Sequence, residues 1–118
     1  MSMIDLTDTV DYNALEYAIR NGHQPDNPCL LDRYLTLGEA RAGAYQPATE
    51  QRAVHMRAFN TLLETICDSC IATHWRVLCL DQIYKPLIAM ERLASTQTDR
   101  AQVRKLHNDL SVLSHYFL

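Results

Sequence analysis

The sequence contains little glycine and proline, and it has no long apolar run. Three glycines and four prolines are distributed over 118 residues, and no segment alternates apolar with polar residues as a half-buried strand would. No apolar run reaches the roughly eighteen residues that a membrane-spanning helix needs. These absences predict an all-α protein with no membrane segment. This length is near the commonest size of one domain, so residues 1–118 are expected to form a single helical domain.

The charges and the missing motifs exclude several classes of function. Eleven basic residues are outnumbered by fourteen acidic ones, and no basic cluster is denser than Arg100, Arg104 and Lys105. A nucleic-acid-binding surface needs a basic stripe, so neither a nucleic-acid partner nor a helix-turn-helix regulator is expected. The sequence has no glycine-rich phosphate loop, nucleophile elbow or zinc-protease motif, and we therefore predict that the protein is not an enzyme. The acidic N-terminus does not resemble a secretory signal, which favours the cytoplasm and reduced cysteines.

The first two helices are predicted from their start and stop signals. The first opens near Asp8 and closes at Gly22, because glycine readily adopts the left-handed conformation that follows a helix. The second starts with Asn27 as N-cap and Pro28 as its first residue. The expected inner faces are Val10, Ala14, Tyr17 and Ala18 in the first helix, and Leu31, Tyr34, Leu35 and Gly38 in the second.

The remaining sequence predicts three further helices, and hence a compact bundle of about five. A third helix of about twenty-four residues starts at Pro47, with apolar residues spaced by three and four. After a turn between Cys70 and His74, a central fourth helix extends to about residue 94 and is kinked at Pro86, which cannot donate an intrahelical hydrogen bond. The expected inner faces are Met56, Phe59, Leu63, Ile66 and Cys70 in the third helix, and Val103, Leu106, Leu110, Leu113 and Phe117 in the last.

The last helix is expected to mediate self-association. It begins at a capping signal formed by Thr96 and Asp99. The chain then ends on three large apolar residues, 116–118, whose surface exceeds what one neighbouring helix covers. We therefore expect a homodimer formed through this C-terminal surface. The alternative is a monomer in which the tail folds over the first helix and covers Tyr12 and Leu15.

Residues 74–90 are too densely apolar for a surface helix, which would show a single apolar stripe. Trp75 and Leu78 are therefore expected in the protein interior. The polar residues set in this segment are the best candidates for contacts with a protein partner: His74, Arg76, Asp81 and Lys85. Asp81 and Lys85 lie four residues apart, so a surface salt bridge between them is the simpler interpretation.

Cys67, Cys70 and His74 carry metal-binding chemistry at helical spacing. On a helix the three side chains would share one face, and thiolates with an imidazole suit zinc or iron. The pattern lacks the second ligand pair of a structural zinc site, and no strand precedes it, as one would in a redox motif. We therefore expect both cysteines to be reduced and packed in the core, with no cofactor. An iron- or zinc-binding protein that uses these three residues is the alternative.

Part of the sequence resembles a known bacterial family. The run from His74 to Asp81, followed by Pro86-Leu87 and by 91–93, is similar to the FagA family, and the likeness extends over residues 28–94. These are small bacterial proteins encoded in iron-starvation-regulated operons beside fumarase and a manganese superoxide dismutase. The resemblance implies a cytoplasmic role during iron limitation and supplies no catalytic residues. We therefore expect a non-enzymatic helper or regulator of the iron-limitation or oxidative-stress response that acts through protein–protein contacts.

Overall fold

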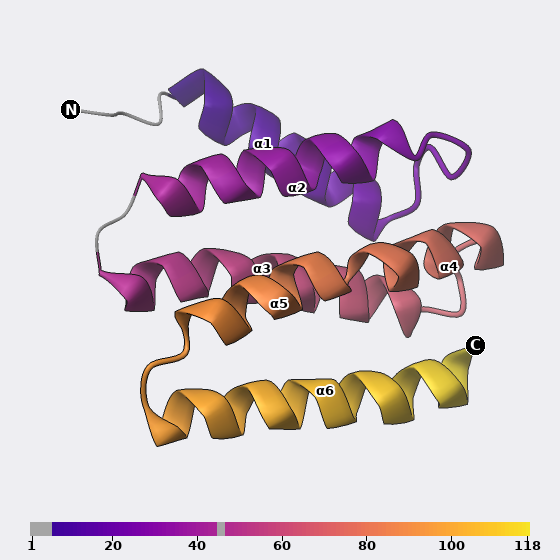
Figure 1. The fold of residues 1–118 in the computed structure, drawn as a ribbon. Helices are drawn as coiled ribbons and strands as arrows, with labels where there is room; N and C mark the ends of the chain where they lie inside the picture. The colour runs from indigo at the N-terminus through magenta and orange to yellow at the C-terminus, as the bar shows by residue number, and fades with distance from the viewer. Residues whose placement is uncertain (1–5, 45–46) are drawn as a thin grey trace.

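The computed structural model describes residues 6–44 and 47–118, and the side chains of the first helix from Asp11 onward. All regular structure in these residues is helical (Figure 1). α4 and α5 are two arms of one helix that is bent by 24°. The described chain therefore has five helices and no strand, which confirms the predicted all-α bundle. The segments are α1 (Leu6–Arg20), α2 (Cys29–Gly43), α3 (Ala48–Ile66), α4 (Thr73–Gln82), α5 (Tyr84–Leu93) and α6 (Gln97–Phe117).

The bend in the central helix follows from Pro86. A proline here donates no hydrogen bond to the carbonyl of Gln82, and its ring crowds that carbonyl. The helix is interrupted one turn earlier, at Ile83, between α4 and α5. The N–H of Ile83 still donates to Cys79 at 2.9 Å, and that of Leu87 donates to Ile83 at 3.4 Å. The predicted kink is confirmed, and the two arms remain in continuous helical register.

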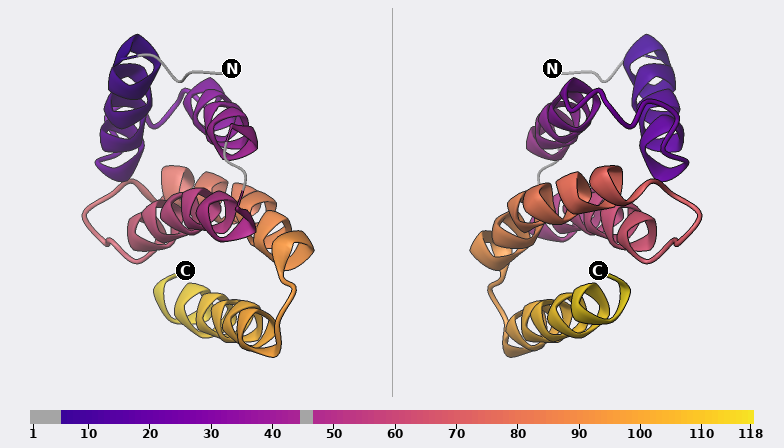
Figure 2. Two further views of the ribbon diagram at one scale, coloured as in Figure 1. Left: turned by 90° about the vertical axis from the view of Figure 1, so that its left-hand side faces the viewer. Right: turned by 90° about the vertical axis from the view of Figure 1, so that its right-hand side faces the viewer.

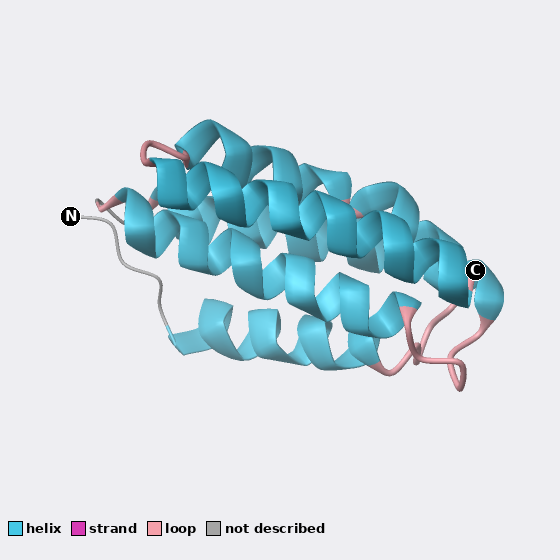
Figure 3. Ribbon diagram, turned by 90° about the horizontal axis from the view of Figure 1, so that it is seen from below, coloured by secondary structure: helices cyan, strands magenta, loops and turns pink. Residues whose placement is uncertain are grey.

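The helices form three layers around α3. In Figures 1 and 2, α1 and α2 form one layer, α3 and α4–α5 form the middle layer, and α6 alone forms the third. Seen from below, the helices run in roughly a common direction (Figure 3). α3 contacts every other helix, and α6 packs against α5 and α3 on the side opposite α1. No helix in the described part of the chain has the length and apolar content needed to cross a bilayer.

The predicted inner faces of α2 and α6 are largely confirmed. All four expected residues of α2 are buried, and in α6 Val103, Leu106 and Leu110 are buried. Leu113 and Phe117 are only half-buried at the end of the seam. The capping signal of α6 is also confirmed, since the N–H of Asp99 donates to the Thr96 hydroxyl at 3.0 Å and the Asp99 carboxylate accepts the N–H of Thr96 at 3.2 Å.

The inner face predicted for α1 is wrong. Tyr12, Leu15 and Ile19 are buried, whereas Ala14 is exposed and Tyr17 is 65% exposed. The buried set is also spaced by three and four, and it carries larger side chains than the face built on two alanines. The side chain of Val10 lies outside the described residues. α1 does end as expected, because Gly22 follows it with a φ of 60°.

The third helix is shorter than predicted, and this changes the environment of two cysteines. Pro47 is its N-cap, but the helix ends at Ile66 and the chain turns over residues 67–72. The Asp68 carboxylate accepts the N–H of Cys70 at 2.9 Å and a hydrogen bond from Arg20 at 2.9 Å, so a local side chain replaces the helical bonds. Cys67 is half-buried at the C-cap and Cys70 is exposed. The prediction that both pack in the core is therefore wrong for Cys70.

The central helix places its largest side chain in the interior, as expected. Trp75 is fully buried, and its indole N–H donates to the carbonyl of Ile19 at 3.0 Å, which joins α4 to the end of α1. Leu78 is half-buried and packs against the edge of the core, so the prediction of an interior position is confirmed only in part for this residue. The apolar composition of residues 74–90 predicted burial on most sides, but only one side of this helix is buried and another side is exposed to solvent.

Candidate functional site

Arg76 lies inside the protein rather than on a contact surface. Its side chain is 6% exposed. Its Nε donates to the carbonyl of Ile66 at 2.8 Å and its Nη2 to the carbonyl of Phe117 at 3.0 Å. The guanidinium therefore joins the end of α3 and the end of α6 to α4. Arg76 is one of the four residues predicted to contact a partner, but its side chain is buried and hydrogen-bonded within the chain.

The other three predicted contact residues are exposed on the central helix. His74 Nε2 lies 2.9 Å from a carboxylate oxygen of Asp26, in the loop before α2. No ion pair joins Asp81 to Lys85 within the part of the chain that the structure describes, so the simpler salt-bridge interpretation does not apply there. Lys85 borders a shallow groove of about 320 Å³ between α2 and α4–α5.

These polar residues share the outer face of the central helix with exposed apolar ones. Val77, Tyr84 and Ile88 are 42%, 45% and 43% exposed, respectively. In Figure 2 no other helix lies beyond α5 on this flank of the middle layer. We call the following six exposed residues the outer stripe: His74, Val77, Asp81, Tyr84, Ile88 and Glu91.

The spacing of the outer stripe is regular. Its members follow one another at three, four, three, four and three residues, which is the repeat of a helix that packs along a second helix. The sequence reasoning found two of the six but missed the other four, since it treated the whole segment as apolar on most sides. The sequence does contain a pattern that could have revealed the outer stripe. Its three-and-four spacing runs alongside the buried series Trp75, Cys79, Ile83, Leu87 and Met90.

The three residues of the metal-binding alternative are not brought together as a ligand set. Within the described residues, no group of three or more His, Cys, Asp or Glu side chains could hold a metal ion. Cys70 is exposed in the turn, and His74 is held by Asp26. Burial raises the pKa of the Cys67 thiol, and the nearby Arg76 guanidinium partly opposes this. A thiol with a raised pKa is a poorer thiolate donor at neutral pH.

A polar cluster around the buried Tyr12 and Tyr34, here called the tyrosine cluster, joins α1, α2 and α3 and extends to the exposed Arg57. The sequence did not predict it. The hydroxyl of Tyr34 donates to Glu16 at 2.5 Å, and Arg57 binds the same carboxylate through Nε at 2.9 Å and Nη2 at 2.9 Å. The rings of Tyr12 and Tyr34 stack at 4.9 Å. The guanidinium groups of Arg41 and Arg57 lie 4.7 and 4.9 Å from the centre of the Tyr12 ring. The ion pair and the cation–π contacts join the three helices, whereas the buried Tyr12 hydroxyl has no hydrogen-bond partner among the described residues.

This cluster has the properties of a structural network. Burial raises the pKa of both Tyr12 and Tyr34 above the ordinary value of 10.0, so neither phenol ionises near neutrality. The hydrogen bond to Glu16 raises the pKa of Arg57. The groove beside it, about 480 Å³ between α1 and α3, is bordered by ion pairs: Arg57 with Glu16 and Arg20 with Glu64.

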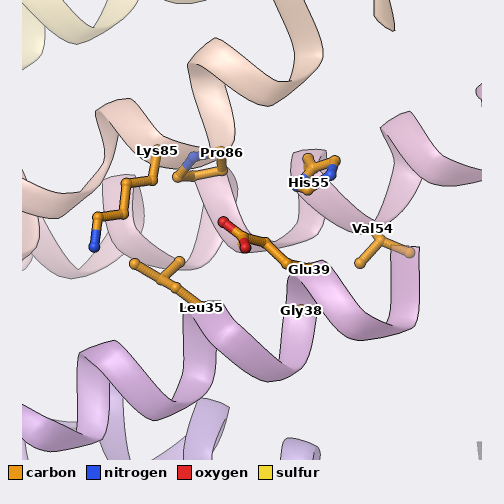
Figure 4. A pocket seen from close by; sticks show the side chains of 8 residues that line it. Leu35, Gly38, Glu39, Val54, His55, Lys85 and Pro86 are labelled. Carbon is orange, nitrogen blue, oxygen red and sulfur yellow. The ribbon is translucent and has the colours of Figure 1, made fainter. Parts of the chain in front are cut away.

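A second polar site lies where α2, α3 and α5 meet. Figure 4 shows Glu39 of α2 reaching toward α5, with Pro86 on one side and His55 of α3 on the other. Burial lowers the pKa of His55, and the Glu39 carboxylate opposes that shift. The hollow has a volume of about 10 Å³, which is room for a single water molecule at most. It is too small for a substrate.

Comparison with protein-family models, with curated proteins and with solved structures finds no match for this chain. The function is therefore inferred from the geometry of the molecule and the chemistry of its surface.

Proposed function

We propose that this protein is a non-enzymatic protein-binding module whose outer stripe receives a helix of a partner. The observation that carries the proposal is the regular exposure of Val77, Tyr84 and Ile88 on one face of a helix whose opposite face is completely buried. An isolated exposed apolar residue needs no explanation, but an aligned series is typical of an interaction surface.

The form of the surface favours a helical partner. The stripe follows one helix over α4 and α5, from residue 74 to residue 91, and its three-and-four spacing is the pattern with which helices pack lengthwise. Apolar residues alternate with His74, Asp81 and Glu91, and Lys85 lies beside Tyr84. Such charges add little affinity at a rim, but they determine the orientation of the partner.

The interior supports the non-enzymatic part of the proposal. Tyr34, Glu16 and Arg57 of the tyrosine cluster bind one another, and Arg76 donates to two backbone carbonyls. The buried hydroxyl of Tyr12 has no hydrogen-bond partner among the described residues. The cavities beside them are either very small or bordered by paired charges. The resemblance to the FagA family supports placing the contact in the response to iron limitation, as part of a helper or regulatory protein in the cytoplasm.

In-cell photo-cross-linking tests this proposal. Tyr84, at the centre of the stripe, is replaced by p-benzoylphenylalanine, and the matched control carries the same residue at Tyr116, which is 80% exposed on α6. Cells that produce the chain are irradiated during growth with an iron chelator. We expect an adduct of one defined mass from position 84 and none from position 116. Equal or absent cross-linking at the two positions would overturn the proposal.

A further inference from the structure

We propose that the helix received by the outer stripe is the same stripe of a second copy of this chain, in antiparallel orientation. This inference rests on the proposed function, since it names the partner of that surface. It moves the dimer contact from the C-terminal surface predicted from the sequence to the central helix.

The stripe is self-complementary when it is read in opposite directions. Two-fold symmetry places each contact residue opposite its counterpart in the other copy. With the axis between Gln82 and Ile83, where the helix bends, Val77 lies opposite Ile88 of the second copy. Asp81 then lies opposite Tyr84 of the second copy. The spacing of three and four is symmetric about this point, so a single register aligns all six positions.

The two central pairings bring together compatible chemistry. Val77 and Ile88 cover each other's exposed apolar surface, once on each side of the axis. The Asp81 carboxylate of one copy meets the Tyr84 hydroxyl of the other, whereas Lys85 borders the groove toward α2. Neither Asp81 nor Lys85 has an ion-pair partner in the same chain among the described residues. At the two ends His74 faces Glu91, but each already has a partner in the same chain: Asp26 lies 2.9 Å from His74, and His107 lies 3.5 Å from Glu91. This outer pair therefore contributes less to the proposed contact than the two central ones.

The C-terminal surface is less suitable as the contact. The inner face of α6 is used against α3 and α5, and Arg76 holds the carbonyl of Phe117 inside the chain. Val112, Tyr116 and Leu118 remain exposed, and the charged residues on the same face, Lys105 and Asp109, already pair with each other at 2.7 Å. A paired polar position such as Asp81 with Tyr84 also selects one register and one orientation, as polar residues do in coiled coils.

Sedimentation equilibrium of the purified chain tests the inference. We expect the wild type to be a dimer at about 50 µM, and Ile88→Lys and Val77→Lys each to weaken the dimer by at least about tenfold. The matched control is Val112→Lys, a change of the same kind at a 58% exposed position on α6, which should remain dimeric. Far-ultraviolet circular dichroism confirms that each variant keeps its helical content.

The outcomes separate this inference from the proposed function. A wild type that is monomeric at about 50 µM overturns the second-copy inference, and so does a dimer that is lost in Val112→Lys but retained in Ile88→Lys. The cross-link from position 84 then decides the broader proposal. An adduct of twice the chain mass supports both, whereas a defined adduct with a different protein supports the proposed function and overturns the self-pairing.

Discussion

The two faces of the central helix differ in burial and in the number of contacts that they make with the rest of the chain. On the inner face Trp75, Cys79, Ile83 and Leu87 are fully buried, and the polar atoms of Trp75 and Arg76 donate to backbone carbonyls of other helices. On the outer face, the two end residues contact other parts of the chain, His74 with Asp26 and Glu91 with His107. Folding accounts for the inner face but gives no reason for the exposed apolar residues Val77, Tyr84 and Ile88 between those ends. This difference is the basis for assigning binding to the outer stripe.

The largest expected effect compares two adjacent residues on opposite faces. Leu87 is fully buried and Ile88 is 43% exposed. Leu87→Ala should lower the free energy of unfolding by about 2–5 kcal/mol, because it removes packed atoms and leaves a cavity. Ile88→Ala should lower it by less than about 1 kcal/mol. Urea denaturation of both variants checks the difference, and equal losses would show that the two faces are not distinct.

A second prediction tests the inner polar contact. Arg76→Met keeps much of the side-chain volume but leaves the carbonyls of Ile66 and Phe117 without their donor. The free energy of unfolding should fall by about 2–3 kcal/mol, since buried acceptors lose their partners. Lys85→Met is the control on the outer side and should change stability by less than about 0.5 kcal/mol. If the Arg76 variant were as stable as the wild type, the guanidinium would not be a structural residue.

A smaller effect is expected in the tyrosine cluster, with a defined dependence on pH. Tyr34→Phe removes the hydrogen bond to Glu16 and should lower the free energy of unfolding by about 1 kcal/mol near neutral pH. The pKa of Tyr34 and that of Tyr12 are raised above 10.0 in the folded state by burial. Above pH 10, the unfolded chain releases phenolic protons that the folded chain retains, so stability should fall as the pH rises.

The comparison that isolates this effect is the slope of stability against pH. Above pH 10 the slope should be less negative in Tyr34→Phe than in the wild type, because one of the two buried phenols is gone. Denaturation midpoints measured at several alkaline pH values check it. Parallel curves for the two proteins would contradict the contribution of Tyr34.

The smallest stability effect is expected on the outer stripe itself. Val77→Lys and Ile88→Lys should each change the free energy of unfolding of the monomer by no more than about 0.5–1 kcal/mol, since both residues are largely in solvent. The measurement is made in dilute protein, where association does not add to stability. A loss as large as that of Leu87→Ala would show that these residues serve folding rather than binding.

Periodicity and local signals predicted most of the architecture. The Thr96 cap, the Pro86 bend and the interior position of Trp75 depend on residues close to one another in the sequence, and all three are confirmed. The prediction of the inner face of α1 was wrong because the sequence of this helix contains two sets of apolar residues with helical spacing. Only contact with α2 and α3 selects the series that contains Tyr12 and Leu15.

The tyrosine cluster and the buried position of Arg76 depend on contacts between helices that are distant in the sequence. The stacked Tyr12 and Tyr34 come from different helices, and their common link to Glu16 and Arg57 has no local spacing that would reveal it. Arg76 could not be separated from the exposed residues near it until the positions of α3 and α6 were known. The outer stripe, by contrast, can be predicted from the spacing of residues in the sequence once the buried face of the central helix is known.

An exchange of charges across the proposed two-fold contact tests the central claim most directly. In the antiparallel register, residue 77 of one copy faces residue 88 of the other, so the double variant Val77→Lys with Ile88→Glu places opposite charges together at both sites. Sedimentation equilibrium at about 50 µM is measured for the double variant and for each single variant. The account predicts that each single variant associates at least about tenfold more weakly than the wild type and that the double variant regains most of the lost affinity. A double variant that associates no better than the single ones, or single variants that associate as strongly as the wild type, would contradict it.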